Sequence, residues 1–295
     1  MKVFVTGATG FIGQRIVIEL TRNGHEVIAL ARSEESAKVL PATKVQIHHG
    51  NIEDLDSLRR GAALADGVIH CAFDHDFTNF VANCEKDRLA IEALGDVLSG
   101  SGRALVITSG TGMGFQGHGK LALENLFDEH HPNPRIASEQ AGISVAQRGV
   151  NVSVVRLPQV HDTFKQGLIT SLIQIAREKK LSAYIGDGSN RWPAAHVHDV
   201  ALLYRLVLER AQPNSRYHAV AEEGIPMREI AEVIGQGLHV PVVSLSPEEA
   251  SAHFGWLSTF VSLDMSASSV QTREQLGWSP RGPGLITDLK QRHYE

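Results

Sequence analysis

Three glycines near the start of the chain have a spacing that suits phosphate binding. Gly7, Gly10 and Gly13 directly follow the short β-branched run Lys2–Thr6, and a helical pattern, Phe11–Asn23, opens within the same motif. Glycines at these points let the backbone approach a pyrophosphate, and the free N–H groups of a helix N-terminus favour an anion. A tight turn without ligand is the alternative. The context predicts a dinucleotide site whose contacts are Gly7, Thr9, Gly10, Phe11, Ile12 and Gly13.

The end of the second predicted strand, His25–Ala31, indicates which dinucleotide is bound. An acidic residue at this point accepts hydrogen bonds from the ribose hydroxyls of NAD. Arg32 and Ser33 stand there instead. A guanidinium can pair with a 2′-phosphate as a fork and a hydroxyl can donate to it, although a solvated arginine on a surface turn is the alternative. The sequence therefore predicts NADP(H), with NAD(H) as the less favoured cofactor.

The histidines are candidates for proton transfer or metal binding. His75 lies between Asp74 and Asp76 after the fourth predicted strand, at the edge where parallel sheets bind ligands, and it could act there as a general acid. The alternative is a polar loop that leads into a helix. No metal site is predicted, because the histidine pairs are poorly shaped for one ion or lack a third ligand at a familiar spacing. These pairs are His48 with His49, His130 with His131, and His196 with His198.

Alternation of strands and helices through the first half predicts an α/β fold with a Rossmann-type, doubly wound parallel sheet. The predicted strands are Lys2–Thr6, His25–Ala31, Val45–His49, Gly67–Phe73, Ala104–Gly110 and Val150–Pro158. The predicted helices are Phe11–Asn23, one capped by Asp54 or Asp56, Phe77–Leu98 and Pro134–Gln147. Residues 111–134 are expected to form a long functional loop with a short helical piece at Lys120–Glu129.

Beyond Pro158 the pattern loosens into helices that alternate with short strands. We expect a dinucleotide-binding domain over residues 1–158 and a smaller, mixed α/β substrate-binding region over 159–295, part of which returns to the main sheet. The predicted helices are Leu168–Lys179, Asp199–Glu209 with Asp199 as N-cap, Met227–Gln236 and Pro247–Phe254. The run Asn190–Pro193 places an arginine and an aromatic ring where they either hold substrate or pack the small region.

Composition excludes several classes of partner. Of the 295 residues 42% are hydrophobic and 21% are charged, and the formal net charge is −5, with no basic block that would indicate nucleic acid. No apolar run is long enough to span a membrane. Cys71 and Cys84 form neither a disulfide framework nor a metal motif. Since the first strand begins at Lys2, no signal peptide is expected, and a cytoplasmic protein is the default.

Several motifs resemble those of the extended short-chain dehydrogenase/reductase superfamily, of the epimerase/dehydratase kind. They are TGATGFIG (Thr6–Gly13), VIHCAF in the fourth strand, TSG (Thr108–Gly110), RLP (Arg156–Pro158), HVHDVA (His196–Ala201) and LGWSP (Leu276–Pro280). The resemblance covers nearly the whole chain. It implies that Cys71, Ala72 and Phe73 line the cofactor, that Asn51 and Ile52 touch the adenine, and that Pro158 and Val160 flank the nicotinamide.

The chain departs from that family at the catalytic position. The family signature is Tyr-x-x-x-Lys, and none of the four tyrosines is followed by such a lysine. Arg135 and Glu139 stand at the expected place, and Ser109 or Thr111 stands for the family serine. The pattern is similar to the atypical branch, which keeps the glycine motif and loses the standard active site. We expect Ser109 and Thr111 to orient a substrate oxygen and Arg135 and Glu139 to tune the site, unless the latter two form only a salt bridge.

These observations predict an NADP(H)-binding oxidoreductase acting on a small carbonyl or alcohol, with the proton supplied by Ser109, Thr111, His75 or a water. The rival hypotheses are a non-redox isomerase or lyase that retains the cofactor, and a cofactor-sensing regulatory protein. By the same resemblance the helices Phe77–Leu98 and Pro134–Gln147 are candidates for a homodimer interface, unless their apolar faces pack within one chain. The predicted interface residues are Phe80, Ile91, Leu94, Ile143 and Val145.

Overall fold

The computed structural model describes residues 1–41, 43–117 and 119–294, and its centre is a seven-stranded parallel sheet. The strand order is β10-β6-β5-β4-β1-β2-β3, and the sequence direction reverses between β1 and β4. This confirms the predicted doubly wound α/β fold, whose ligands bind at such a reversal. The strands are β1 (Lys2–Thr6), β2 (Glu26–Ala31), β3 (Val45–His49), β4 (Gly67–His70), β5 (Ala104–Gly110), β6 (Asn151–Leu157) and β10 (Ser215–His218).

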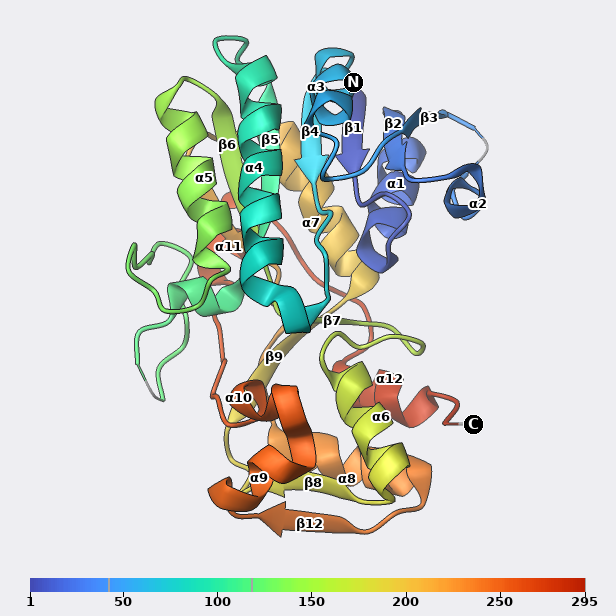
Figure 1. Ribbon diagram of the computed structural model, residues 1–295, viewed down its shortest axis with the longest axis vertical. Helices are drawn as coiled ribbons and strands as arrows, with labels where there is room; N and C mark the ends of the chain where they lie inside the picture. The colour runs from blue at the N-terminus through green and yellow to red at the C-terminus, as the bar shows by residue number, and fades with distance from the viewer. Residues whose placement is uncertain (42, 118, 295) are drawn as a thin grey trace.

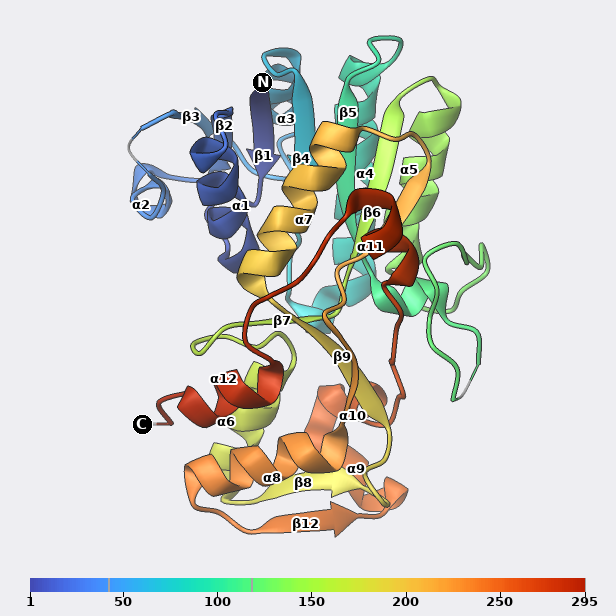
Figure 2. The same ribbon diagram turned by 180° about the vertical axis from the view of Figure 1, so that it is seen from behind.

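Helices cover both faces of this sheet. On one face α3, α4 and α5 pack side by side (Figure 1), and on the other α1 packs against α7 (Figure 2). Each face has its own apolar core, because strands buried on both sides need apolar residues at every position. The bounds are α1 (Phe11–Arg22), α2 (Glu34–Ala37), α3 (Leu55–Ala63), η1 (Phe77–Asn79), α4 (Phe80–Leu98), η2 (Thr111–Gly114), α5 (Ile136–Gln147) and α7 (Val197–Arg210).

The chain beyond β6 divides between two places. Helix α7, strand β10 and helix α11 (Val270–Leu276) return to the main sheet, while the rest forms a smaller lobe with a separate core (Figure 2). A three-stranded sheet, β11-β9-β7, runs between the two parts. The remaining elements are β7 (Gln159–His161), α6 (Ile169–Lys179), β8 (Ser182–Ile185), β9 (Arg191–His196), β11 (Glu222–Pro226), α8 (Met227–Leu238), β12 (Val242–Leu245), α9 (Pro247–Phe254), η3 (Gly255–Leu257), α10 (Ser258–Val261) and α12 (Leu285–Gln291).

Two of the predicted elements that differ from the structure are the fourth strand and the helical piece in the long loop. Strand β4 ends at His70 rather than Phe73, because its partner β1 ends at Thr6 and the chain leaves the sheet there. The predicted helical piece Lys120–Glu129 is wrong. Its backbone bonds elsewhere, since the Ala122 N–H donates to the Ser266 carbonyl and Ala122 pairs with Ala267 in an isolated bridge.

The apolar residues predicted for a dimer interface serve mainly the core of a single chain. Ile91, Leu94 and Val145 are fully buried where α4 packs against α5 and the sheet, so they offer no surface to a second copy. Phe80 and Ile143 remain partly exposed. The interface prediction is therefore wrong for those three residues.

Candidate functional site

The glycine turn lies where the strand order reverses, and close packing requires its glycines. Gly7 has a positive φ of 69°, and a Cβ on it would lie 2.7 Å from the backbone nitrogen of Ala72. A Cβ on Gly13 would lie 2.0 Å from the Gly7 carbonyl oxygen. Gly10 is the N-cap of α1, and no described side chain caps that end. The turn therefore fits a pyrophosphate, which would receive the uncapped N–H groups of the helix.

The other residues predicted to contact the cofactor surround this turn with different exposure. Val160 is 4% exposed and belongs to the core, whereas Asn51 lies on the surface with its side-chain oxygen accepting from the N–H groups of Glu53 and Asp54. The half-buried members of the set are Thr9, Phe11, Ile12, Ile52, Cys71, Ala72, Phe73 and Pro158.

Arg32 lies directly after β2 with an exposed side chain. Within residues 1–41, 43–117 and 119–294 its guanidinium has neither an ion-pair nor a hydrogen-bond partner. Ser33 caps α2, where its Oγ accepts from the N–H of Ser36 and its own proton remains free to donate. An available guanidinium beside an available hydroxyl is an arrangement that can receive a phosphate.

Two hydroxyls end strand β5 at the same edge of the sheet. Ser109 is 3% exposed, and its Oγ finds no hydrogen-bond partner among the described residues. Thr111 is 5% exposed and begins η2. A buried hydroxyl without a partner is rare, because burial without a hydrogen bond costs about 1–3 kcal/mol. Ser109 is therefore a candidate donor to a bound substrate oxygen.

Arg135 does not pair with Glu139, so the alternative of an i,i+4 salt bridge between them is wrong. Its Nη1 donates to Asp87 Oδ2 and to Ser138 Oγ, each at 2.7 Å, and its Nη2 donates to the Thr108 carbonyl at 3.0 Å. The guanidinium also stacks on Phe73, 3.9 Å from the ring centroid. The side chain is thus held between β5, α4 and the segment after β4.

Asp87 extends this contact to the cofactor turn. Its Oδ1 accepts from His70 Nε2 at 3.0 Å, and His70 Nδ1 accepts from the Thr6 hydroxyl at 2.7 Å. Burial would raise the pKa of Asp87, but Arg135, His70 and Ser138 outweigh it and hold the pKa at about 2. Thr6 precedes Gly7, so Arg135 is connected through buried groups to the glycine turn.

Sequence reasoning missed Asp87 and His70. The available signal was a carboxylate on the apolar stripe of a helix, because Asp87 shares the buried face of α4 with Cys84 and Ile91. A buried carboxylate requires a charged or hydrogen-bonding partner. The sequence did not indicate which partner this would be.

Glu139 belongs to a second buried cluster, with Arg156 of β6 and Arg216 of β10. Arg156 donates to it from Nε at 2.7 Å and Nη2 at 2.9 Å, and Arg216 donates from Nε at 2.8 Å. Burial would raise the pKa of Glu139, but the two arginines lower it. Arg156 also donates to the carbonyls of Leu123 and Leu126, so the cluster holds the long loop rather than the edge at Arg135.

His75 lies on the surface near the opening of the site. Burial of its ring, then the positive charges of Arg135 and Lys165, lower its pKa below 6.5. The imidazole is therefore neutral at pH 7. A neutral ring suits the acceptance of a proton from an alcohol better than its donation to a carbonyl.

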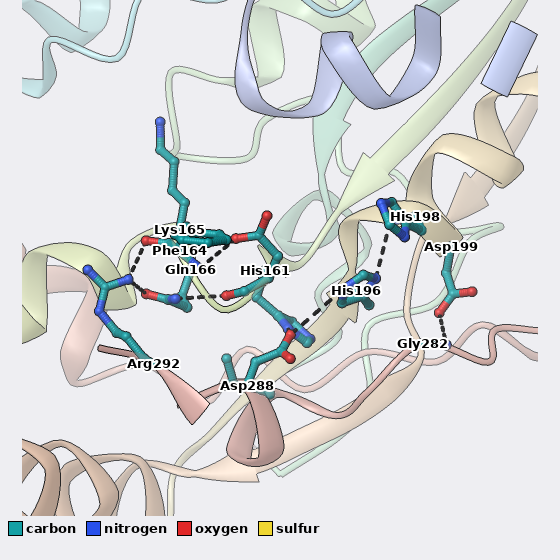
Figure 3. A network of polar contacts seen from close by, with 12 residues as sticks. His161, Phe164, Lys165, Gln166, His196, His198, Asp199, Gly282, Asp288 and Arg292 are labelled. Carbon is teal, nitrogen blue, oxygen red and sulfur yellow. Dashed lines mark hydrogen bonds and ion pairs between the residues drawn. The ribbon is translucent and has the colours of Figure 1, made fainter. Parts of the chain in front are cut away.

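A polar network around His161 and Asp288 lies between strand β7 and the C-terminal helix α12 (Figure 3). His161 on β7 donates from Nδ1 to Asp288 on α12 at 2.7 Å. Burial lowers the pKa of His161 to about 4, so its ring is neutral at pH 7. The next residue, Asp162, lies 3.9 Å from Arg15 of α1. The network therefore connects α1 with the C-terminal helix.

The N-terminus of α7 differs from the prediction that Asp199 caps it. The N-cap is His196, whose Nδ1 accepts from the N–H of His198. The Asp199 carboxylate instead accepts from the N–H groups of Arg281 and Gly282, which turn the chain toward α12 (Figure 3).

The run Asn190–Pro193 packs the smaller lobe. Trp192 is fully buried, and Asn190 donates to the carbonyls of Val261 and Leu263. Arg191 lies 3.3 Å from Asp264. These contacts support packing rather than substrate binding for this run.

No described helix combines the length and apolar character needed to cross a membrane. Among the same residues no group of three or more His, Cys, Asp or Glu side chains could hold a metal ion.

Comparison with known proteins agrees with this geometry. A model of the NAD dependent epimerase/dehydratase family matches residues 3–89, which hold the glycine turn. Two proteins described as uncharacterized are similar over nearly their whole lengths. One, from Schizosaccharomyces pombe, is 47% identical with all of both chains covered, and the other, from Saccharomyces cerevisiae, is 42% identical with 98% of each covered.

More distant similarities indicate the class of chemistry. The decarboxylating sterol-4-alpha-carboxylate 3-dehydrogenase of Dictyostelium discoideum is 26% identical over 77% of this chain and 73% of that protein. The crystal structure of a dTDP-glucose 4,6-dehydratase from Streptomyces venezuelae, with NAD bound, has a TM-score of 0.79 at 19% identity and covers 99% of this chain and 96% of its own. Its likeness concerns the fold.

The family is one of NAD(P)-dependent enzymes, and the glycine turn at the reversal of the sheet is where such a cofactor binds. Through residues 3–89 this chain belongs to the NAD dependent epimerase/dehydratase family.

Proposed function

We propose that this chain is an NADP(H)-dependent oxidoreductase of a small carbonyl or alcohol that works without the Tyr-x-x-x-Lys pair. One observation carries the proposal: the same edge of the sheet presents the glycine turn, the available guanidinium of Arg32 and the unpartnered hydroxyl of Ser109. When bound, the nicotinamide supplies or accepts a hydride. The names of family relatives, which include dehydrogenases and reductases, support the same class of reaction.

The residues of this chain divide the remaining tasks. Ser109 donates its hydroxyl proton in a hydrogen bond to the substrate oxygen, with Thr111 beside it at the start of η2. A serine hydroxyl is a weak acid, so proton transfer needs a second group. When an alcohol is oxidised, the neutral ring of His75 or a water accepts the proton, and in carbonyl reduction a water supplies it.

Arg135 acts as a positioning residue in this scheme. Its two terminal nitrogens are engaged by Asp87, Ser138 and the Thr108 carbonyl. A guanidinium keeps its proton at physiological pH, so it is excluded as the acid. Its contacts instead hold β5, which carries Ser109, against α4.

Cofactor choice is the direct test of the proposal. NADPH should bind at least about tenfold more tightly than NADH, since a charge-assisted contact with the 2′-phosphate contributes about 1.4 kcal/mol or more. Calorimetry on Arg32→Ala should show this preference abolished. Arg210→Ala is the matched control, because Arg210 is exposed at the C-terminal end of α7, away from the cofactor edge. Equal affinities of the unaltered protein for both cofactors would reject the NADP(H) assignment.

Turnover separates the oxidoreductase from its rivals. Ser109→Ala should lower NADPH-dependent carbonyl reduction by about 10²-fold, at the lower end of the range for a lost catalytic group, with NADPH affinity within a few-fold. Cofactor binding without oxidation of NADPH across a carbonyl panel would favour the sensor. Conversion without net NADPH consumption would favour the isomerase or lyase.

A further inference from the structure

The segment after β4 presents a series of aromatic rings at the edge of the sheet. Phe73, which carries the stacked guanidinium of Arg135, contacts the His75 ring edge-on at 5.4 Å between centroids and the Phe80 ring at 6.2 Å. Phe77 lies 5.5 Å from Phe80 and 6.2 Å from His75. Because Arg135 also donates to the carbonyl of Thr108, these rings begin beside the residue that precedes Ser109.

The smaller lobe supplies two more rings to the same place. Trp256 stacks on Phe77 with centroids 4.9 Å apart and planes 10° apart, and Phe260 lies 6.0 Å from Phe77. We call the six rings the aromatic cluster; they are Phe73, His75, Phe77, Phe80, Trp256 and Phe260. The start of α4 extends below the sheet toward α10 in Figure 1, which agrees with these contacts.

The base of the Trp256 segment is fixed while its ring is exposed. Asn190 donates to the carbonyl of Val261, and Arg191 pairs with Asp264, so β9 anchors the chain that follows Trp256. Gly255 precedes the ring with a φ of 55°. Trp256 is nevertheless 46% exposed, whereas Trp192 and Trp278 are at most 2% exposed. A ring that served only to join the two lobes would be expected to be buried as those are.

We propose that the aromatic cluster is the substrate-binding surface of this site and that it takes a planar aromatic carbonyl compound, whose ring stacks on the exposed ring of Trp256, which is itself backed by Phe77. This rests on the proposed function for the identity of the reacting group. Aromatic faces favour a flat π system over a saturated ring of similar size, through offset-stacked and edge-to-face contacts. A sugar nucleotide would need a cation for its diphosphate, and on β9 the guanidinium of Arg191 is already paired with Asp264.

The test compares two probes with one carbon skeleton, 2-naphthaldehyde and decahydro-2-naphthaldehyde, on the NADP⁺-bound protein. Calorimetry should show the aromatic probe binding about tenfold more tightly. Trp256→Ala and Phe77→Leu should both reduce that ratio to near one, while Trp256→Phe should keep it. Phe164→Ala is the control, since Phe164 is 77% exposed but lies outside the aromatic cluster.

Tryptophan fluorescence gives a second readout that packing alone would not change. The aromatic probe should quench the emission of the unaltered protein, and Trp256→Phe should abolish that quenching while preserving the binding preference, because the other two tryptophans are buried. Equal binding of the two probes would overturn the proposal. So would a Trp256→Ala protein that melts at a lower temperature but keeps the ratio, because the ring would then only join the lobes.

The experiments distinguish failure of the aromatic-cluster proposal from failure of the oxidoreductase proposal. Preferential binding of 2-naphthaldehyde, abolished by Trp256→Ala, supports the aromatic cluster whether or not NADPH is oxidised with this probe. If no carbonyl is ever reduced, the oxidoreductase fails and the binding surface stands. If decahydro-2-naphthaldehyde is reduced with the same kcat/KM as 2-naphthaldehyde, the aromatic preference fails and the oxidoreductase stands.

Discussion

Arg135 and Glu139, four positions apart at the start of helix α5, belong to two different buried ion clusters that serve different parts of the molecule. Arg135 belongs to a cluster with Asp87 and His70 that ends at the cofactor turn. Glu139 belongs to a cluster with Arg156 that ends at the carbonyls of the 123–126 loop. Residues at i and i+4 lie on one side of a helix, but they pair only if no better partner is offered by the elements around them.

Because the two clusters end at different segments, we expect the Asp87 cluster to affect cofactor binding and the Glu139 cluster to affect only stability. Groups around Asp87 lie between the hydroxyl of Thr6 and the carbonyl of Thr108, so their loss should disturb the cofactor turn. Groups around Glu139 hold α5 to β6 and β10. Variants in the two clusters should therefore differ in cofactor affinity even where they cost similar stability.

The largest effect is expected from Glu139→Gln. The change leaves the fully buried Arg156 without its ionic partner, and removing one member of a buried ion pair costs about 3–5 kcal/mol. Urea unfolding should show this loss, while the folded protein should bind NADPH within a few-fold of the unaltered chain. Glu129→Gln, at an exposed position, should cost less than about 0.5 kcal/mol. A loss below about 1 kcal/mol for Glu139→Gln would contradict the buried pair.

A somewhat smaller loss of stability, about 2–4 kcal/mol, is expected from Asp87→Asn, because Arg135 is 12% exposed and can be partly solvated. This variant should also weaken NADPH binding by about tenfold, since the contacts through His70 to Thr6 lose their charged end. Calorimetry on the folded variant measures the second effect. If Asp87→Asn and Glu139→Gln bound NADPH equally well, the proposed division of roles would be wrong.

The free energy of unfolding should depend on pH in a different range for each cluster, because His218 and Asp87 titrate at different pH values. His218 accepts from Arg156, and burial followed by that positive charge lowers its pKa to about 3 from 6.5. A depressed folded pKa means that the unfolded chain binds the proton first, so stability is full above pH 6.5 and falls as the pH is lowered toward 3. Asp87, with a folded pKa of about 2 against 3.8, loses its contribution only between about pH 4 and 2.

The expected size of the His218 effect is about 3 kcal/mol between pH 6.5 and 4, which urea unfolding at several pH values can measure. His218→Gln should reduce the slope in that range, where His161 also contributes, and leave the drop below pH 4 in place. An unchanged slope between pH 6.5 and 4 would show that His218 is not the group responsible.

The local sequence predicted most of the sheet correctly, because each signal lies within a few residues. The β-branched run before Gly7 and the glycines after it specify a strand, a tight turn and a helix with no help from distant parts of the chain. The predictions were wrong where a residue contacts a segment that is distant in the sequence. Ala122 is extended because it pairs with Ala267, and His196 rather than Asp199 caps α7 because Asp199 is engaged by Arg281 and Gly282.

The candidate site divides in the same way. The sequence by itself determined the cofactor turn, the absence of Tyr-x-x-x-Lys and the presence of Arg32 after the second strand. Only the tertiary structure decided that Arg135 pairs with Asp87, that Glu139 pairs with Arg156, and that Phe77 meets Trp256. The physical reason is that buried charges and aromatic faces take whichever partner the fold brings within reach. Those partners lie tens to more than a hundred residues away along the chain.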